Sequence, residues 1–136
     1  MIKEKLKKYV QALNKIPNDE QKYAWLMLFG KKSIELVDDL KLDKFEVPGC
    51  QTRTWVIPGK DFRPTLHFSA DSDALISKGL VCMLADIFSG STSKEILAFE
   101  RRDLEDLRLD VLLTPGRRNG AHNMLQKIRD YALELS

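Results

Sequence analysis

The sequence predicts an α+β fold in which helices pack with a small antiparallel sheet of about three strands. Amphipathic stretches, with apolar residues at helical spacing, occupy both ends and the middle of the chain. At 45–70, short apolar runs alternate with polar residues and are separated by Pro and Gly, which is typical of strands and turns. Because the 136 residues contain no repeat, low-complexity tract or linker, we expect one domain over 1–136.

The predicted helices of the first third follow from apolar spacing and capping residues. The first helix is expected over residues 2–13, and the second is expected to begin at a cap formed by Asn18 or Asp19. Gly30 is predicted to end or interrupt the second helix. The apolar stripe of that helix is predicted to be Tyr23, Leu26, Met27 and Ile34.

The central section predicts a hairpin followed by a buried helix. Trp55–Ile57 and Leu66–Phe68 are the expected strands, and Phe45–Val47 is a candidate third strand. The apolar helix is predicted to run from a cap at Asp71 or Ser72 to about Phe88. Because this helix is apolar on nearly all sides, we expect it at the centre of the core, with Cys82 inside it buried and inert.

Capping signals define the two helices of the last third. Thr92 and Glu95 form the pattern of a capping box, and Thr114 followed by Pro115 is typical of a helix start. The last helix should pack on an apolar stripe that comprises Ala121, Met124, Leu125, Ile128 and Ala132.

Cys50 is the most informative residue of the sequence. It follows Pro48 and Gly49, which favour a tight turn, and it precedes the first predicted strand. A cysteine at the tip of a turn is expected to be accessible to solvent, whereas most free cysteines are buried. The residues alone leave two readings open, a reactive thiol and an ordinary turn cysteine.

Arg117 and Arg118 are the second notable feature, because cations in the first turn of a helix oppose the macrodipole. Such a departure from a local rule indicates either function or pairing with Asp103, Glu105 or Asp106. An arginine close to Cys50 would stabilise the thiolate and lower the pKa of the thiol.

The composition and the missing motifs exclude several classes of protein. The net charge of +2 is too balanced to indicate nucleic acid, and no apolar run approaches the roughly 20 residues of a membrane span. The charged segment 1–8 lacks the apolar core of a secretory signal, so we expect a cytoplasmic protein.

Cofactor and metal sites are not predicted either. The spacings of Cys50, His67, Cys82 and His122 match no zinc pattern, so we expect no metal. No phosphate-binding or dinucleotide-binding glycine motif is present, so we expect no cofactor. A cysteine–histidine hydrolase would need His67 or His122 to reach Cys50, which the sequence does not establish.

Three segments together resemble the SufE-type sulfur-acceptor proteins. Gly49–Trp55 is similar to the family's Gly-Cys-Gln-Ser-x-Val-Trp signature, and Asp71–Leu80 is similar to the block before its central helix. Leu113–Gly120 is similar to the block Leu-Thr-Pro-Ser-Arg-x-x-Gly. The blocks occur in the family's order, and the similarity extends over nearly the whole chain.

The resemblance implies a fold shared with iron–sulfur scaffold proteins of the IscU type. It also implies that the protein is an accessory protein of sulfur transfer and not an enzyme. Cys50 would take sulfur as a persulfide from a pyridoxal-phosphate cysteine desulfurase and deliver it to an iron–sulfur scaffold complex. Arg117 matches the family's arginine near the desulfurase interface, and Gln51 and Asp73 are further candidates for partner binding. Lys78 matches a motif position that we expect to be structural.

The chain departs from the family pattern at three positions. Thr52 replaces serine, Thr54 replaces an apolar residue and Gly116 replaces serine, which leaves the helix cap to Thr114. These departures bear on which desulfurase and which acceptor the chain recognises. Two alternatives stay open, a thiol redox protein that cycles at Cys50 and an interaction module that regulates a desulfurase without carrying sulfur.

Overall fold

The computed structural model describes residues 1–60 and 63–136 and confirms the α+β fold. Its strands are β1 (Thr54–Lys60), β2 (Thr65–Ser72) and β3 (Ser91–Thr92). Its α-helices are α1 (Ile2–Asn14), α2 (Asp19–Lys32), α3 (Leu75–Phe88), α4 (Ser93–Ala98), α5 (Leu109–Leu112) and α6 (Pro115–Glu134). Short 3-10 helices occupy Asp38–Leu40, Asp43–Phe45 and Arg101–Leu107.

The three strands form one antiparallel sheet in the order β1-β2-β3, and the predicted hairpin is confirmed. Side chains of β2 alternate as the sequence indicates, with Leu66, Phe68 and Ala70 buried on the face that packs against the helices. Pro58 lies inside β1, which tolerates a missing N–H because β1 is an edge strand.

The third strand is not the one that the sequence suggested. Phe45–Val47 forms only a single bridge, from Glu46 to Trp55, and Phe45 ends a 3-10 helix. The third strand is β3, which pairs with the first two residues of β2. A strand of only two residues carries too little alternation to be recognised in a sequence.

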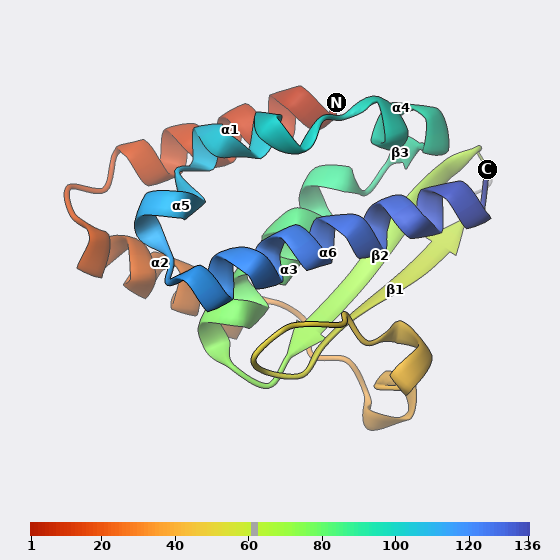
Figure 1. The fold of residues 1–136 in the computed structure, drawn as a ribbon, viewed down its shortest axis with the longest axis horizontal. Helices are drawn as coiled ribbons and strands as arrows, with labels where there is room; N and C mark the ends of the chain where they lie inside the picture. The colour runs from red at the N-terminus through yellow and green to blue at the C-terminus, as the bar shows by residue number, and fades with distance from the viewer. Residues whose placement is uncertain (61–62) are drawn as a thin grey trace.

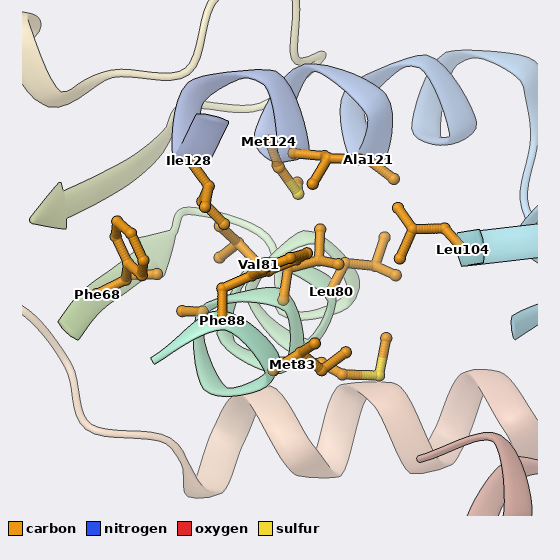
Figure 2. Packing of buried hydrophobic residues seen from close by; sticks show 14 of the residues in the cluster. Phe68, Leu80, Val81, Met83, Phe88, Leu104, Ala121, Met124 and Ile128 are labelled. Carbon is orange, nitrogen blue, oxygen red and sulfur yellow. The ribbon is translucent and has the colours of Figure 1, made fainter. Parts of the chain in front are cut away.

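Helix α3 lies at the centre of the core, as predicted. It contacts α1, α2, α6 and both long strands, and Figure 1 shows it between the helices and the hairpin. Its side chains Leu80 and Val81 meet Ala121, Met124 and Ile128 of α6 (Figure 2), and all five are at most 2% exposed. The core therefore fixes α6 beside α3, and α6 is the helix that supports the site described below.

The prediction for Gly30 is wrong, because this residue lies inside α2, which ends at Lys32. A Cβ atom at Gly30 would lie 2.6 Å from the carbonyl oxygen of Leu75, and one at Gly79 would lie 2.1 Å from that of Leu26. The two glycines thus allow the backbones of α2 and α3 to touch. Packing outweighs the cost of about 1 kcal/mol for a glycine within a helix.

The predicted cap of α3 is also wrong. The N-cap is Ala74, with no side-chain bond, and Asp71 and Ser72 are the last residues of β2. Sequence reasoning cannot separate these cases, because an aspartate before an apolar helix fits a cap and a strand end equally well.

Asp71 instead holds together the end of β2 and the segment after α2. Its buried carboxylate accepts hydrogen bonds from the backbone N–H groups of Ser72 and Leu36, at 2.8 Å and 3.0 Å. The ammonium groups of Lys78 and Lys41 lie 3.6 Å and 3.7 Å away. Lys78 is itself only 4% exposed, so the structural role expected for it agrees with its position.

The remaining capping predictions are confirmed. Asn18 accepts from the N–H of Gln21, Thr92 and Glu95 form a capping box, and Thr114 accepts from the N–H of Arg117. Ile34 does not belong to the stripe of α2, since it follows the end of the helix and is 87% exposed. Among the described residues, no helix is both long and apolar enough to cross a membrane.

Candidate functional site

Cys50 lies in a loop that rests on α6. The loop runs from Val47, whose N–H donates to the carbonyl of Thr54, and this bond closes its base. Gly49 adopts a φ of 78°, the left-handed region that glycine tolerates best. A Cβ at this position would lie 2.4 Å from Nδ2 of Asn123, so the loop backbone and α6 are in close contact.

The thiol of Cys50 is half-buried against the same helix. Its Sγ donates to the carbonyl oxygen of Gly120 at 3.7 Å, a long and weak hydrogen bond. A Cβ on Gly120 would lie 3.4 Å from this sulfur, so the thiol packs directly against the backbone of α6 at this residue. The thiol at this turn is therefore partly accessible to solvent and partly covered by α6.

The electrostatic environment keeps this thiol protonated at rest. Burial raises the pKa of Cys50, the Thr54 hydroxyl opposes this, and the Glu46 carboxylate adds a smaller increase. Neither Arg117 nor Arg118 contributes to the shift, so neither stabilises the thiolate in this conformation. A raised pKa lowers the thiolate fraction at neutral pH, and with it the intrinsic reactivity.

Gln51 lies across the first turn of α6. A Cβ built on Gly116 would lie 2.2 Å from Nε2 and 2.6 Å from Cδ of Gln51, so the amide of Gln51 fills the space that a side chain at 116 would take. The change from the family's serine to Gly116 therefore has a structural counterpart. We call this contact the Gln51–Gly116 seat.

A group of hydroxyls holds the other side of the loop. The Thr52 hydroxyl donates to Oγ of Ser77 at 3.1 Å and lies 3.4 Å from Oγ of Ser72. Thr54 is fully buried, and its hydroxyl donates to the carbonyl of Thr52 at 3.1 Å. Thr54 can thus replace an apolar residue without leaving a buried hydroxyl unpaired.

The three sequence blocks that carry the resemblance meet at this site. The Cys50 loop contacts α6 through Gly116 and Gly120, and it contacts the start of α3 through Ser77. Asp73 is exposed beside the loop, and its N–H donates to the carbonyl of Arg53 at 3.0 Å.

Arg117 is half-buried in the first turn of α6, one residue after the Gln51–Gly116 seat. Within the described part of the chain, its side chain makes no hydrogen bond or ion pair. Of the predicted partner residues, Gln51 belongs to the loop and Asp73 lies at its end, whereas Arg117 is placed near it only as the neighbour of Gly116 on α6.

Cys82 was expected to be buried, but both cysteines are partly exposed. Cys82 lies at the wall of a cavity of about 510 Å³, which Tyr9, Phe29 and Phe68 also line. Its Sγ donates to the carbonyl of Ala70 at 3.5 Å, and burial raises the pKa of its thiol. The two cysteines differ in secondary structure, because Cys82 belongs to a core helix and Cys50 to a loop.

No metal cluster accompanies either thiol. Among residues 1–60 and 63–136, no three His, Cys, Asp or Glu side chains gather in a way that could hold a metal ion. His67 is exposed on β2, and His122 lies on α6 in a hollow with Arg101 and Arg118. Neither histidine contributes to the pKa shift of Cys50.

Sequence reasoning missed the residues that shape the seat of the thiol. Gly116 and Gly120 are four residues apart, so they share one face of α6. Two glycines in a helix cost stability, and this pattern is the signal that another segment approaches there. Ser77, Asn123 and Glu46 gave no such signal, because their roles depend on contacts distant in sequence.

Comparisons with known proteins identify the family of the chain and a structure of similar fold. A sequence model of the SufE family, described as Fe-S metabolism associated domain, matches residues 7–132. The solution structure of a hypothetical protein from Thermus thermophilus is similar with a TM-score of 0.77 and 18% identity, over 96% of this chain and 95% of that one. At this identity the structural likeness concerns the fold alone. From the family match over most of its length, the chain belongs to the SufE family of Fe–S metabolism associated domains.

Proposed function

We propose that Cys50 accepts sulfur from a pyridoxal-phosphate cysteine desulfurase and carries it, as a persulfide, to an iron–sulfur scaffold complex. Membership of the SufE family associates the chain with Fe–S metabolism. The finer role rests on one observation, a thiol on a loop whose seat on α6 consists of glycines and one hydrogen bond of 3.7 Å. Such a thiol can leave its seat without disturbing the core.

The chemical step needs only the thiolate of Cys50 and a persulfide on the partner. The thiolate attacks the outer sulfur of the desulfurase persulfide, so that a new S–S bond forms on Cys50 and the old one breaks. The electron pair of the broken bond leaves on the desulfurase cysteine, which becomes a thiolate. The exchange consumes no oxidant or reductant, and on this chain it needs no bound cofactor.

The resting position of the thiol favours transfer only in the complex. Burial and Glu46 raise the pKa of Cys50, so the free protein holds mostly the unreactive thiol. Binding of the desulfurase would move the loop away from α6. The sulfur of Cys50 would then lose the burial that raises its pKa. Gln51, Asp73 and Arg117 are the proposed contacts, because Gln51 belongs to the loop, Asp73 bonds to Arg53 at its end, and Arg117 follows the residue of α6 that Gln51 contacts.

Two serine variants test the proposal against its alternatives. Cys50→Ser should abolish the stimulation of a cysteine desulfurase, whereas Cys82→Ser, the matched control, should leave it nearly intact. Stimulation that survives in Cys50→Ser would favour a regulatory module that carries no sulfur. Loss of stimulation in Cys82→Ser alone would show that the roles of the two cysteines are reversed.

A thiol redox role is less well supported by the contacts of the two cysteines. A resolving cysteine should lie near the reactive one, whereas Cys50 belongs to the loop on α6 and Cys82 to α3. Their sulfurs contact different elements, the carbonyl of Gly120 on α6 and the carbonyl of Ala70 on β2.

A further inference from the structure

A groove on the other side of α6 gathers arginines around a histidine. It has a volume of about 780 Å³ and is lined by residues of the 3-10 helix Arg101–Leu107, of α5 and of α6. Figure 1 shows α5 leading into the start of α6. The cationic and imidazole side chains of the groove are Arg101, Arg102, Arg108, Arg118 and His122. A second hollow of about 440 Å³ shares Arg101 and His122 with it and adds Arg129.

This groove is separate from the sulfur site. Successive residues of an α-helix are rotated by about 100°, so Arg118 and His122 project about 200° away from Gly116 and Gly120. The seat of Cys50 and the groove therefore occupy opposite sides of α6, and the proposal below goes beyond sulfur transfer.

Among the described side chains that line the groove, arginines outnumber carboxylates. Four arginines line it, against Glu105 and Asp106, and Arg118 also has an interaction of its own. Arg102 is already paired with Glu100, at 2.6 Å. Within the described residues, Arg101 and Arg108 form no ion pair.

The arginines of the groove affect the pKa of His122. Burial lowers the pKa of its imidazole, and Arg101 and Arg118 lower it further. No carboxylate contributes to the shift, although Glu105 and Asp106 line the same groove. An anion bound beside Arg101 and His122 would offset part of this repulsion and would raise the pKa of His122.

The backbone at Arg108 is an independent sign of function. With a φ of 57° and a ψ of 36°, Arg108 is the only non-glycine residue of the described chain in the left-handed region. This position joins the 3-10 helix to α5, and glycine would occupy it without strain. Strained residues of this kind cluster at binding sites, where the side chain is needed in spite of its cost.

We propose that this groove binds a small anion that carries phosphate or carboxylate groups. Arg101 and Arg108 contribute guanidinium groups, whose paired N–H donors match both kinds of oxyanion. His122 lines the same groove and donates a hydrogen bond to the bound anion. Leu104 and Leu109 provide an apolar wall, so the site suits an anion with an attached apolar part, and the volume suits a ligand of nucleotide size.

The two histidines of the chain allow a direct test by NMR, because His67 on β2 serves as an internal control. Inorganic pyrophosphate and citrate are titrated separately at constant ionic strength, and both imidazole signals are followed against pH. We expect saturable shifts of His122 and a higher pKa of its ring with at least one of the probes, while His67 changes little. Binding of pyrophosphate alone would identify phosphate as the ligand chemistry, and binding of citrate alone would identify carboxylate.

Two variants separate a binding role from a structural one. Arg108→Gly removes the side chain and the backbone strain together, so the thermal midpoint should stay or rise while anion affinity falls at least about tenfold. Arg101→Gln should weaken binding by a similar factor, and Arg63→Gln, an exposed arginine of another loop, should not.

The proposal is overturned if His122 moves no more than His67, or if sodium chloride of equal ionic strength reproduces its shifts. It is also overturned if Arg108→Gly and Arg101→Gln bind both probes as the unchanged protein does. Because the readout involves no sulfur transfer, these results do not depend on the role of Cys50.

Discussion

Replacing Gly116 with alanine should release Cys50 without weakening the fold. The new Cβ would lie 2.2 Å from Nε2 of Gln51, so the Gln51 side chain must leave its place on α6. The atoms displaced are the flexible end of an exposed side chain, and alanine in a helix stabilises by up to about 1 kcal/mol relative to glycine. The free energy of unfolding should therefore stay constant or rise slightly.

The magnitude of the release follows from the contact that is lost. Packing of about one methylene contributes about 1 kcal/mol, and a change of this size alters the fraction of open loop about fivefold. We expect iodoacetamide to alkylate Cys50 about fivefold faster in Gly116→Ala. The rate is measured in a Cys82→Ser background, so that only one thiol reacts.

Two further variants make this test specific. Gln51→Ala removes the same contact from the other side, so the double variant should react no faster than either single variant. Asn119→Ala raises helix propensity at an exposed position of α6 and should leave the rate unchanged. An unchanged rate in Gly116→Ala, or additive effects in the double variant, would refute the Gln51–Gly116 seat.

Three other predictions concern the Cys50 loop and the first turn of α6. Thr52→Val removes the hydroxyl contacts to Ser72 and Ser77 and should lower the free energy of unfolding by about 1 kcal/mol, measured in urea, while Thr52→Ser should not. Arg117→Ala should leave the thermal midpoint unchanged or slightly higher, because a cation opposes the dipole there, but should weaken desulfurase stimulation most at low salt; early unfolding with normal stimulation would show a structural role. Because the folded state raises the pKa of Cys50, stability should fall as pH rises above the unfolded thiol's pKa, and this fall should be smaller in Cys50→Ser.

Local signals in the sequence predicted the parts of the fold that local interactions determine. Thr92 and Thr114 were identified as caps because a hydroxyl and an N–H three residues later suffice to define them. The alternation along β2 was equally informative, since one face is buried. The start of α3 was missed because Asp71 binds Leu36, a partner 35 residues away.

The same distinction applies to the site. Cys50 could be singled out from Pro48 and Gly49, which place it in a turn. The element that it rests on could not, because the carbonyl that its thiol contacts belongs to Gly120, 70 residues later in the chain. Likewise, the glycine pair in α6 predicts a close approach but does not say which segment makes it.

The most direct test of sulfur acceptance is a peptide map after incubation with a cysteine desulfurase and cysteine. Trypsin separates the two thiols, because Lys44 and Arg53 bracket Cys50 whereas Lys78 and Lys94 bracket Cys82. After alkylation of the protein, we predict that the peptide 45–53 gains about 32 Da, the mass of one sulfur atom, and that 79–94 does not. Oxygen adducts on 45–53, no added mass, or sulfur on 79–94 alone would contradict the assignment of Cys50 as the sulfur acceptor.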